Sequence, residues 1–264
     1  MKPYLRIAAS QFPVSHDMAQ NFGYIERLIG EASASDVDVI HFPETALPGY
    51  LGFPKGNSAA FDWNALETLT GAIRDLAFAN NIWVILGSIR KEAGQLPRNC
   101  ICVISNSGTI AGYYDKQRLY KSEADFYSAG NSPLVVDING HKRGFLICYD
   151  NCFPELYKPY REVGVGLIFH SFHNAGNERE TSIKDLMAAN LLVRSADNQM
   201  WISASNSSKS YSPLPATIAR PDGSANRGKR HAVGIVIEDY PKAELGWTYD
   251  NTRRELASHF HCAT

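Results

Sequence analysis

The sequence has almost no net charge and no long hydrophobic run. Its 264 residues include 26 basic and 27 acidic side chains, which gives a net charge of −1. Without a basic field the surface does not attract nucleic acid or anionic lipid, and we expect neither as a partner. No apolar stretch approaches the roughly 20 residues of a membrane span, and the start lacks the apolar region and cleavage site of a signal peptide. We therefore expect a cytoplasmic protein.

Cysteine is also scarce. The five cysteines, at positions 100, 102, 148, 152 and 262, are an odd number for a chain of this length, which argues for reduced thiols and against a disulfide framework. The spacing of Cys148 and Cys152 is one residue longer than Cys-x-x-Cys, and no second pair stands where zinc would need it. A redox or metal role for this pair is an alternative to a core or nucleophilic role for Cys148, and we expect no metal site.

Linkers and internal repeats are missing, so we predict one domain over residues 1–264. Apolar runs predict strands at 5–12, 37–42, 82–89, 165–170 and 200–206, and apolar periodicity predicts helices at 18–32, 66–77, 154–163 and 178–197. Turn residues at 106–108 and 221–223 predict hairpins, the second joining 215–219 to 231–238. This order of elements indicates a mixed sheet, or two stacked sheets with helices outside.

Three reactive side chains follow apolar stretches: Glu44 comes after VIHFP, Lys116 after GYYD and Cys148 after FLI. Taken singly, such an acid or lysine is more often solvated, and such a cysteine more often belongs to the core. Taken together, they sit where α/β proteins place reactive groups, at rigid strand ends. A thiol is mostly protonated near neutral pH and needs a base or a nearby cation to become a nucleophile. A glutamate and a lysine could fill these two roles.

The segments around these residues resemble the motifs of the nitrilase-like carbon–nitrogen hydrolases. FPETALPGY (42–50) resembles the glutamate motif, YDKQRLYKSEADFYSAG (114–130) the lysine motif and GFLICYDNCFPEL (144–156) the cysteine motif, in the order of that family. RSADNQMWISASN (194–206) and PATIARPDGS (215–224) are similar to its later helix, strand and closing hairpin. The resemblance covers nearly the whole chain. It implies a four-layer αββα sandwich of two mixed β-sheets with helices outside.

The resemblance also implies roles for the candidate catalytic residues. Glu44 would be the general base, Lys116 the stabiliser of the transition state and Cys148 the nucleophile, while Glu123 would position the lysine and the substrate amine. Together with Lys116, the backbone N–H of Tyr149 would stabilise an oxyanion. The implied reaction hydrolyses a carbon–nitrogen bond through a cysteine thioester and requires no cofactor.

The substrate expected from these residues is a small linear amide or a carbamoyl compound. The expected substrate contacts are Tyr149, Phe153, His170, His173 and Asn174. Members of that family that cleave nitriles typically carry tryptophan after the nucleophile, so the tyrosine at this position favours amides. Asn151 and Cys152 stand where members that bind a carboxylate often have arginine, and neither can form a bidentate salt bridge.

Two alternatives remain open from the sequence: a nitrile-hydrolysing member of the same family, and a non-catalytic binding or regulatory module on the same fold. The resemblance further implies a homodimer or a higher homo-oligomer that pairs through residues 154–163 and 178–197.

Overall fold

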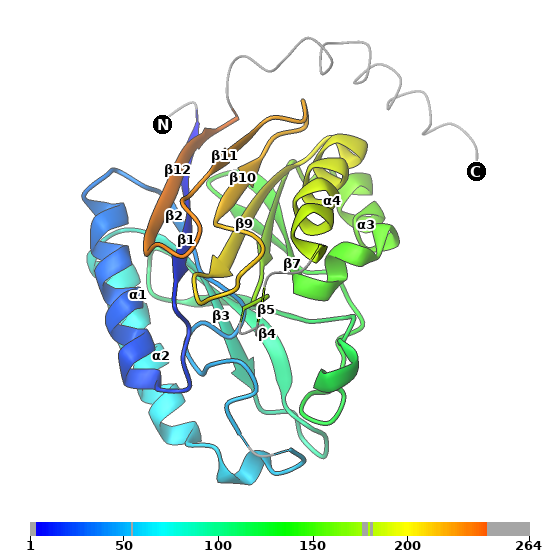
Figure 1. Ribbon diagram of the computed structural model, residues 1–264. Coiled ribbons are helices and arrows are strands. Elements are labelled where there is room, and N and C mark those ends of the chain that lie inside the picture. The colour runs from blue at the N-terminus through cyan, green and yellow to red at the C-terminus, as the bar shows by residue number, and fades with distance from the viewer. Residues whose placement is uncertain (1–3, 54, 176–178, 180–181, 242–264) are drawn as a thin grey trace.

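The computed structural model describes residues 4–53, 55–175, 179 and 182–241, and it shows two β-sheets packed between two layers of helices (Figure 1). The fold class expected from the resemblance, an αββα sandwich, is confirmed. Among the described helices, none combines the length and the apolar character needed to cross a bilayer.

The first sheet has the strand order β12-β1-β2-β3-β4-β5. Its strands are β1 (Leu5–Phe12), β2 (Val39–His41), β3 (Trp83–Arg90), β4 (Arg98–Ile104), β5 (Ile110–Asp115) and β12 (Gly234–Tyr240). Helices α1 (Met18–Ser33) and α2 (Trp63–Ala79) cover its outer face (Figure 1). A short helical turn, η1 (Ser58–Ala60), precedes α2.

The second sheet has the strand order β6-β7-β8-β9-β10-β11. Its strands are β6 (Val135–Ile138), β7 (His141–Ile147), β8 (Leu167–Ser171), β9 (Trp201–Ser207), β10 (Thr217–Ala219) and β11 (Ala225–Arg227). Helices α3 (Lys158–Glu162) and α4 (Ile183–Asn198) lie outside it (Figure 1). The short turns η2 (Lys121–Glu123), η3 (Cys148–Cys152) and η4 (Pro154–Leu156) complete the elements.

Both sheets have the same pairing pattern. From β12 to β5 the successive pairs are antiparallel, parallel, parallel, antiparallel and antiparallel, and the same series runs from β6 to β11. The sheets meet where the end of β1 pairs with β9, at Gln11↔Asn206 and Phe12↔Ser207. The carboxyl ends of β2, β7 and β8 are thereby brought to one region between the sheets.

Side chains alternate between two cores, as the period of a strand requires. On β1, Ile7 and Ala9 belong to the core that includes the second sheet, whereas Ala8 belongs to the core beneath α1 and α2. Helix α1 contributes Ile25 and Leu28 to that outer core. Burial of these apolar surfaces holds the layers together.

A buried polar cluster links the two sheets. His41 on β2 lies with its Nδ1 3.1 Å from Ser203 Oγ and its Nε2 2.9 Å from Ser171 Oγ. Ser205 Oγ donates to the carbonyl oxygens of Ser10 and His41, at 2.7 Å each. Directional hydrogen bonds of this kind fix how the first sheet is positioned on the second.

Two features differ from the sequence-based expectation. The strand expected at 231–238 does not pair with 215–219; it forms β12, which pairs with β1, while β10 pairs with β11 across the predicted turn. Strand β6 was not predicted, although it forms a hairpin with β7 through Asn139 and Gly140. The helix expected over 178–197 is present as α4, and the start of its expected range lies partly outside the described residues.

Candidate active site

Glu44 lies just beyond β2, in a segment held by both sheets. The Phe42 N–H donates to the Ile85 carbonyl at 2.8 Å, and the Glu44 N–H donates to the Phe172 carbonyl of the second sheet at 3.2 Å. Thr45 has φ of 47°, which is uncommon for a β-branched residue. Such backbone strain persists only where the surroundings enforce it. The segment therefore presents the fully buried Glu44 side chain in a fixed position.

Lys116 follows β5 and is buried between two carboxylates. Its Nζ lies 2.7 Å from Glu44 Oε1 and 2.7 Å from Glu123 Oε1, with the lysine side chain 1% exposed and both acids 0%. Glu123 belongs to η2, and its Oε2 accepts the Tyr120 N–H at 2.6 Å. A buried ammonium with this geometry is fully charged and cannot move freely.

Asn99 is a member of this cluster that the sequence analysis missed. Its Nδ2 donates to Glu44 Oε1 at 2.8 Å and to Glu123 Oε1 at 3.4 Å. With both Asn99 and Lys116 on Oε1, the other oxygen of Glu44 is buried without a hydrogen-bond partner among the described residues. Glu44 Oε2 is therefore available to take a proton.

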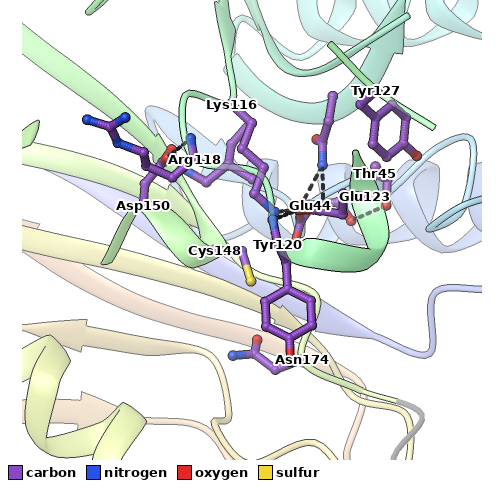
Figure 2. A network of polar contacts seen from close by, with 12 residues as sticks. Glu44, Thr45, Lys116, Arg118, Tyr120, Glu123, Tyr127, Cys148, Asp150 and Asn174 are labelled. Carbon is purple, nitrogen blue, oxygen red and sulfur yellow. Dashed lines mark hydrogen bonds and ion pairs between the residues drawn. The ribbon is translucent and has the colours of Figure 1, made fainter. Parts of the chain in front are cut away.

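Cys148 opens the turn η3 at the end of β7. Its φ is 43°, in the left-handed region that side-chain-bearing residues rarely adopt. Asp150 holds this turn: its carboxylate accepts the Ile147 N–H at 2.9 Å, the Tyr114 hydroxyl at 2.8 Å and the Arg118 N–H at 2.8 Å. Figure 2 shows Cys148 beside the group formed by Glu44, Lys116 and Glu123, with its sulfur directed toward the side on which Tyr120 and Asn174 lie. The three candidate side chains from separate strand ends thus lie together.

Electrostatics in this group keep the proton on the thiol in the resting site. Burial raises the pKa of Glu44 to about 7, against the opposing effect of Lys116. Burial, and then the Glu44 carboxylate, raise the pKa of the Cys148 thiol. The pKa of Lys116 is raised because the Glu44, Cys148 and Glu123 charges outweigh the effect of burial. The resting site therefore holds a neutral thiol beside a carboxylate base and a permanent cation.

The expected substrate contacts fall into two groups. Tyr149 packs edge-on against Tyr120, with ring centroids 5.4 Å apart, and against Phe153 at 5.2 Å. Tyr50, which was not predicted, stacks on His173 at 4.8 Å. Tyr149 thus forms one aromatic cluster with Tyr120 and Phe153, and His173 forms a second one with Tyr50.

Asn174 lies on the same side of Cys148 as the Tyr120 ring (Figure 2). Its backbone N–H donates to Asn206 Oδ1 at 3.2 Å, whereas its own Oδ1 is buried without a partner among the described residues. The backbone N–H of the preceding residue, His173, is directed at the Cys148 sulfur and lowers the thiol pKa against the larger effect of burial.

His170, another expected substrate contact, lies against the backbone of the nucleophile. Its side chain is 0% exposed, and its Nε2 is 3.3 Å from the carbonyl oxygen of Cys148. A direct contact between His170 and the substrate stays a prediction.

The four described cysteines, at 100, 102, 148 and 152, are free thiols. Cys152 is exposed whereas Cys148 is only partly so, and they do not form a disulfide. Over the described part of the chain, no cluster of three or more metal-ligating side chains occurs.

A family profile described as carbon–nitrogen hydrolase matches residues 6–235, and the chain belongs to this family. It is 26% identical over 224 residues to a deaminated glutathione amidase of Dictyostelium discoideum, covering 77% of this chain and 74% of that protein. It is 30% identical over 173 residues to an (R)-stereoselective amidase of a Pseudomonas species, covering 64% of this chain and 58% of the relative.

Solved structures show the same fold. A nitrilase-superfamily amidase from a Nesterenkonia species superposes with a TM-score of 0.77 at 20% identity, with 98% of each chain covered. A mutant of that amidase was solved with the acetamide moiety of fluoroacetamide added covalently at its active-site cysteine, and it matches with a TM-score of 0.78 at 21% identity over 97% of this chain and 96% of that chain. The protein described here is accordingly a carbon–nitrogen hydrolase of the nitrilase fold.

Proposed function

We propose that the protein is an amidase that hydrolyses a small amide through a thioester on Cys148. The observation that carries this proposal is the buried pairing of Lys116 with Glu44 and Glu123 beside Cys148, which leaves Glu44 Oε2 without a partner among the described residues. The names of the similar proteins, which include amidases, support the same reaction class.

The first step is attack on the amide carbonyl. Glu44 Oε2 takes the thiol proton while the Cys148 sulfur forms a bond to the carbonyl carbon, so no stable thiolate is needed in advance. The electron pair of the C=O bond moves to oxygen. Lys116 Nζ and the Tyr149 N–H donate hydrogen bonds to this oxyanion.

The second step expels the amine. The oxyanion re-forms its double bond, the carbon–nitrogen bond breaks, and the protonated Glu44 gives its proton to the leaving nitrogen. Ammonia departs and the thioester remains.

The third step hydrolyses the thioester. Glu44 takes a proton from water as the water oxygen attacks the thioester carbon, and the proton returns to sulfur when the carbon–sulfur bond breaks. The acid leaves and the thiol is restored.

Glu123 and Asn99 hold the groups that react. Glu123 Oε1 lies 2.7 Å from Lys116 Nζ, and Asn99 Nδ2 donates to Glu44 Oε1 at 2.8 Å. Because these charges and dipoles are already fixed, they need no reorganisation during the reaction. Glu123 thus gives the lysine a second carboxylate partner in addition to Glu44.

The charge of the site favours neutral or cationic amides over acidic ones. Glu44, Glu123 and Lys116 are buried together, and with both acids ionised their formal charges sum to −1, which repels a carboxylate held near the reacting carbon. The Arg118 guanidinium stacks on the Phe153 ring and lies 3.6 Å from a carboxylate oxygen of Glu155. We therefore expect a compact, neutral or aminated amide to be the better substrate.

Ammonia release from a panel of compounds tests the proposal. The panel contains propionamide, glycinamide, succinamic acid, an N-carbamoyl compound and propionitrile, with Cys148→Ala as the inactive control. We expect turnover of propionamide and glycinamide, weaker turnover of succinamic acid and none by the control. Turnover of the nitrile alone would replace the amidase proposal with a nitrilase. Equal activity of wild type and Cys148→Ala, or none with any compound, would remove it.

A further inference from the structure

A buried histidine contacts the backbone of the nucleophile. His170 on β8 has its Nε2 3.3 Å from the Cys148 carbonyl oxygen and its Nδ1 3.3 Å from the Tyr157 hydroxyl. The ring of Phe172 stacks on it with centroids 4.3 Å apart. The imidazole is fully buried, so these contacts fix its position.

These partners determine which ring nitrogen carries the hydrogen. Burial lowers the pKa of His170 to about 3, so the ring is neutral at ordinary pH. A carbonyl oxygen can only accept, and therefore Nε2 carries the hydrogen and donates to Cys148. Nδ1 then carries no hydrogen and lies 3.3 Å from the Tyr157 hydroxyl, which donates to Asn151 Oδ1 at 3.0 Å. The tautomer follows from geometry without any charge on the ring.

The contacted carbonyl belongs to the peptide unit of the oxyanion donor. The C=O of Cys148 and the N–H of Tyr149 share one planar trans peptide, so they point in opposite directions. When His170 holds the carbonyl toward the buried side, the N–H must face the other way. Cys148 has φ of 43°, a strained backbone conformation that persists only where the surrounding contacts hold it.

We propose that His170 is a positioning residue that holds the Cys148–Tyr149 peptide so that the Tyr149 N–H faces the oxyanion. This inference rests on the proposed function, in which that N–H stabilises the tetrahedral intermediates. His170 would act on acyl transfer and not on removal of the thiol proton, which is assigned to Glu44. Loss of its hydrogen bond should therefore lower the rate of amide turnover but not the rate of Cys148 alkylation. A general structural defect would lower both rates together.

The test compares amide turnover with alkylation of Cys148 by iodoacetamide, which forms no oxyanion. His170→Met removes the hydrogen-bond donor and replaces the imidazole with an apolar side chain of similar length. Because one oxyanion-hole donor is worth roughly 100- to 1000-fold in kcat, we expect a partly misplaced one to cost about 10- to 100-fold, with KM changed less than about twofold. The alkylation rate of Cys148, followed by peptide mass spectrometry, should stay within about threefold of wild type, since the groups that ionise the thiol are intact.

His170→Gln is the rescue variant, because its amide nitrogen can reach the same carbonyl, and it should recover most of kcat. His41→Gln is the matched control: His41 is equally buried but bonded to Ser171 and Ser203, so the ratio of turnover to alkylation should stay at the wild-type value. Tyr157→Phe removes the hydroxyl that contacts His170 Nδ1 and should lower kcat less than His170→Met does. If His170→Met does not fold, the comparison of turnover with alkylation is made on Tyr157→Phe instead.

Three results would overturn the inference: an unchanged kcat in His170→Met, an equal fall of turnover and alkylation in that variant, or a His170→Gln enzyme no better than His170→Met. If His170→Met does not fold, an unchanged ratio in Tyr157→Phe overturns it. Failure of the proposed function is a separate observation, because wild type itself would then release no ammonia.

Discussion

Glu44 should control how activity depends on pH. Burial raises its pKa to about 7, with Glu123 adding to the rise and Lys116 opposing it, and only the ionised form can take the thiol proton. We therefore expect kcat/KM to rise about tenfold per pH unit up to about pH 7 and then level off. In Glu123→Gln a negative neighbour is lost, so the pKa of Glu44 falls and the rising limb moves to lower pH. A limb that stays in place, or moves upward, would contradict the role of Glu44 as base.

Lys116 should matter for stability as well as for catalysis. Lys116→Met leaves the carboxylates of Glu44 and Glu123 buried without their cation, and breaking a buried ion pair from one side costs about 3–5 kcal/mol. We expect a lower midpoint in urea at pH 8 and no detectable amide turnover. At pH 5, where Glu44 is protonated, the stability difference from wild type should shrink. The same difference at both pH values would show that the acids are not charged in the folded protein.

Glu44, Lys116 and Cys148 could be predicted because each directly follows an apolar strand within a recognisable segment. Asn99 and Tyr50 could not, because nothing in their local sequence distinguishes them. Asn99 reaches Glu44 only through the register of β3 against β4 and through the loop that follows β2. His170 could be predicted to lie near the nucleophile, but its contact with the Cys148 carbonyl could not, since a sequence gives the order of residues along a strand and not what lies behind a turn.

At the scale of elements, Gly87 on β3 makes room for the segment that carries Glu44. A Cβ at Gly87 would lie 1.8 Å from the Pro43 carbonyl oxygen and 2.8 Å from the Thr45 nitrogen, so the whole segment would have to shift. Misplacement by about 1 Å can cost roughly 100-fold in rate. We expect Gly87→Ala to lower kcat by at least that factor and to destabilise the fold, as measured by turnover and urea unfolding.

Gly23→Ala is the control for this substitution. Gly23 lies in α1, where an added Cβ meets nothing within 4 Å, and alanine in a helix is favoured over glycine by about 0.5–1 kcal/mol. This variant should be slightly more stable and fully active. Full activity in Gly87→Ala would mean that the Glu44 segment can move without cost.

Most helices and strands could be predicted from periodicity, and the errors concern pairing. The turn signal at Asn139-Gly140 was present before β7, yet the short β6 with two exposed residues lacks a clear apolar run. The partner of β12 could not be predicted, because Leu5 pairs with Tyr240 from the other end of the described chain. Local sequence determines that a strand forms there, whereas packing of the entire sandwich determines its neighbour.

For the whole molecule, oligomerisation through α4 stays a prediction. Leu186 is 64% exposed and Val193 47%, seven residues apart on one helix face, and Val163 at the end of α3 is 44% exposed. Apolar side chains so placed are typical of a contact between copies. Val193→Glu should convert a dimer to a monomer in sedimentation velocity. Phe78→Glu on α2, 68% exposed on the opposite layer, is the control and should leave the association unchanged. A wild-type monomer would refute the prediction.

The return of β12 to β1 has a consequence for synthesis on the ribosome. As the nascent chain emerges, β1 comes out before the other strands of both sheets, but its antiparallel neighbour at Gly234–Tyr240 follows only after the second sheet has been translated. Until then β1 is an edge strand of the first sheet with unpaired backbone N–H and C=O groups, which can pair with other chains and cause aggregation. Premature termination just before this strand should therefore give an insoluble product even though every residue of the catalytic centre has been made.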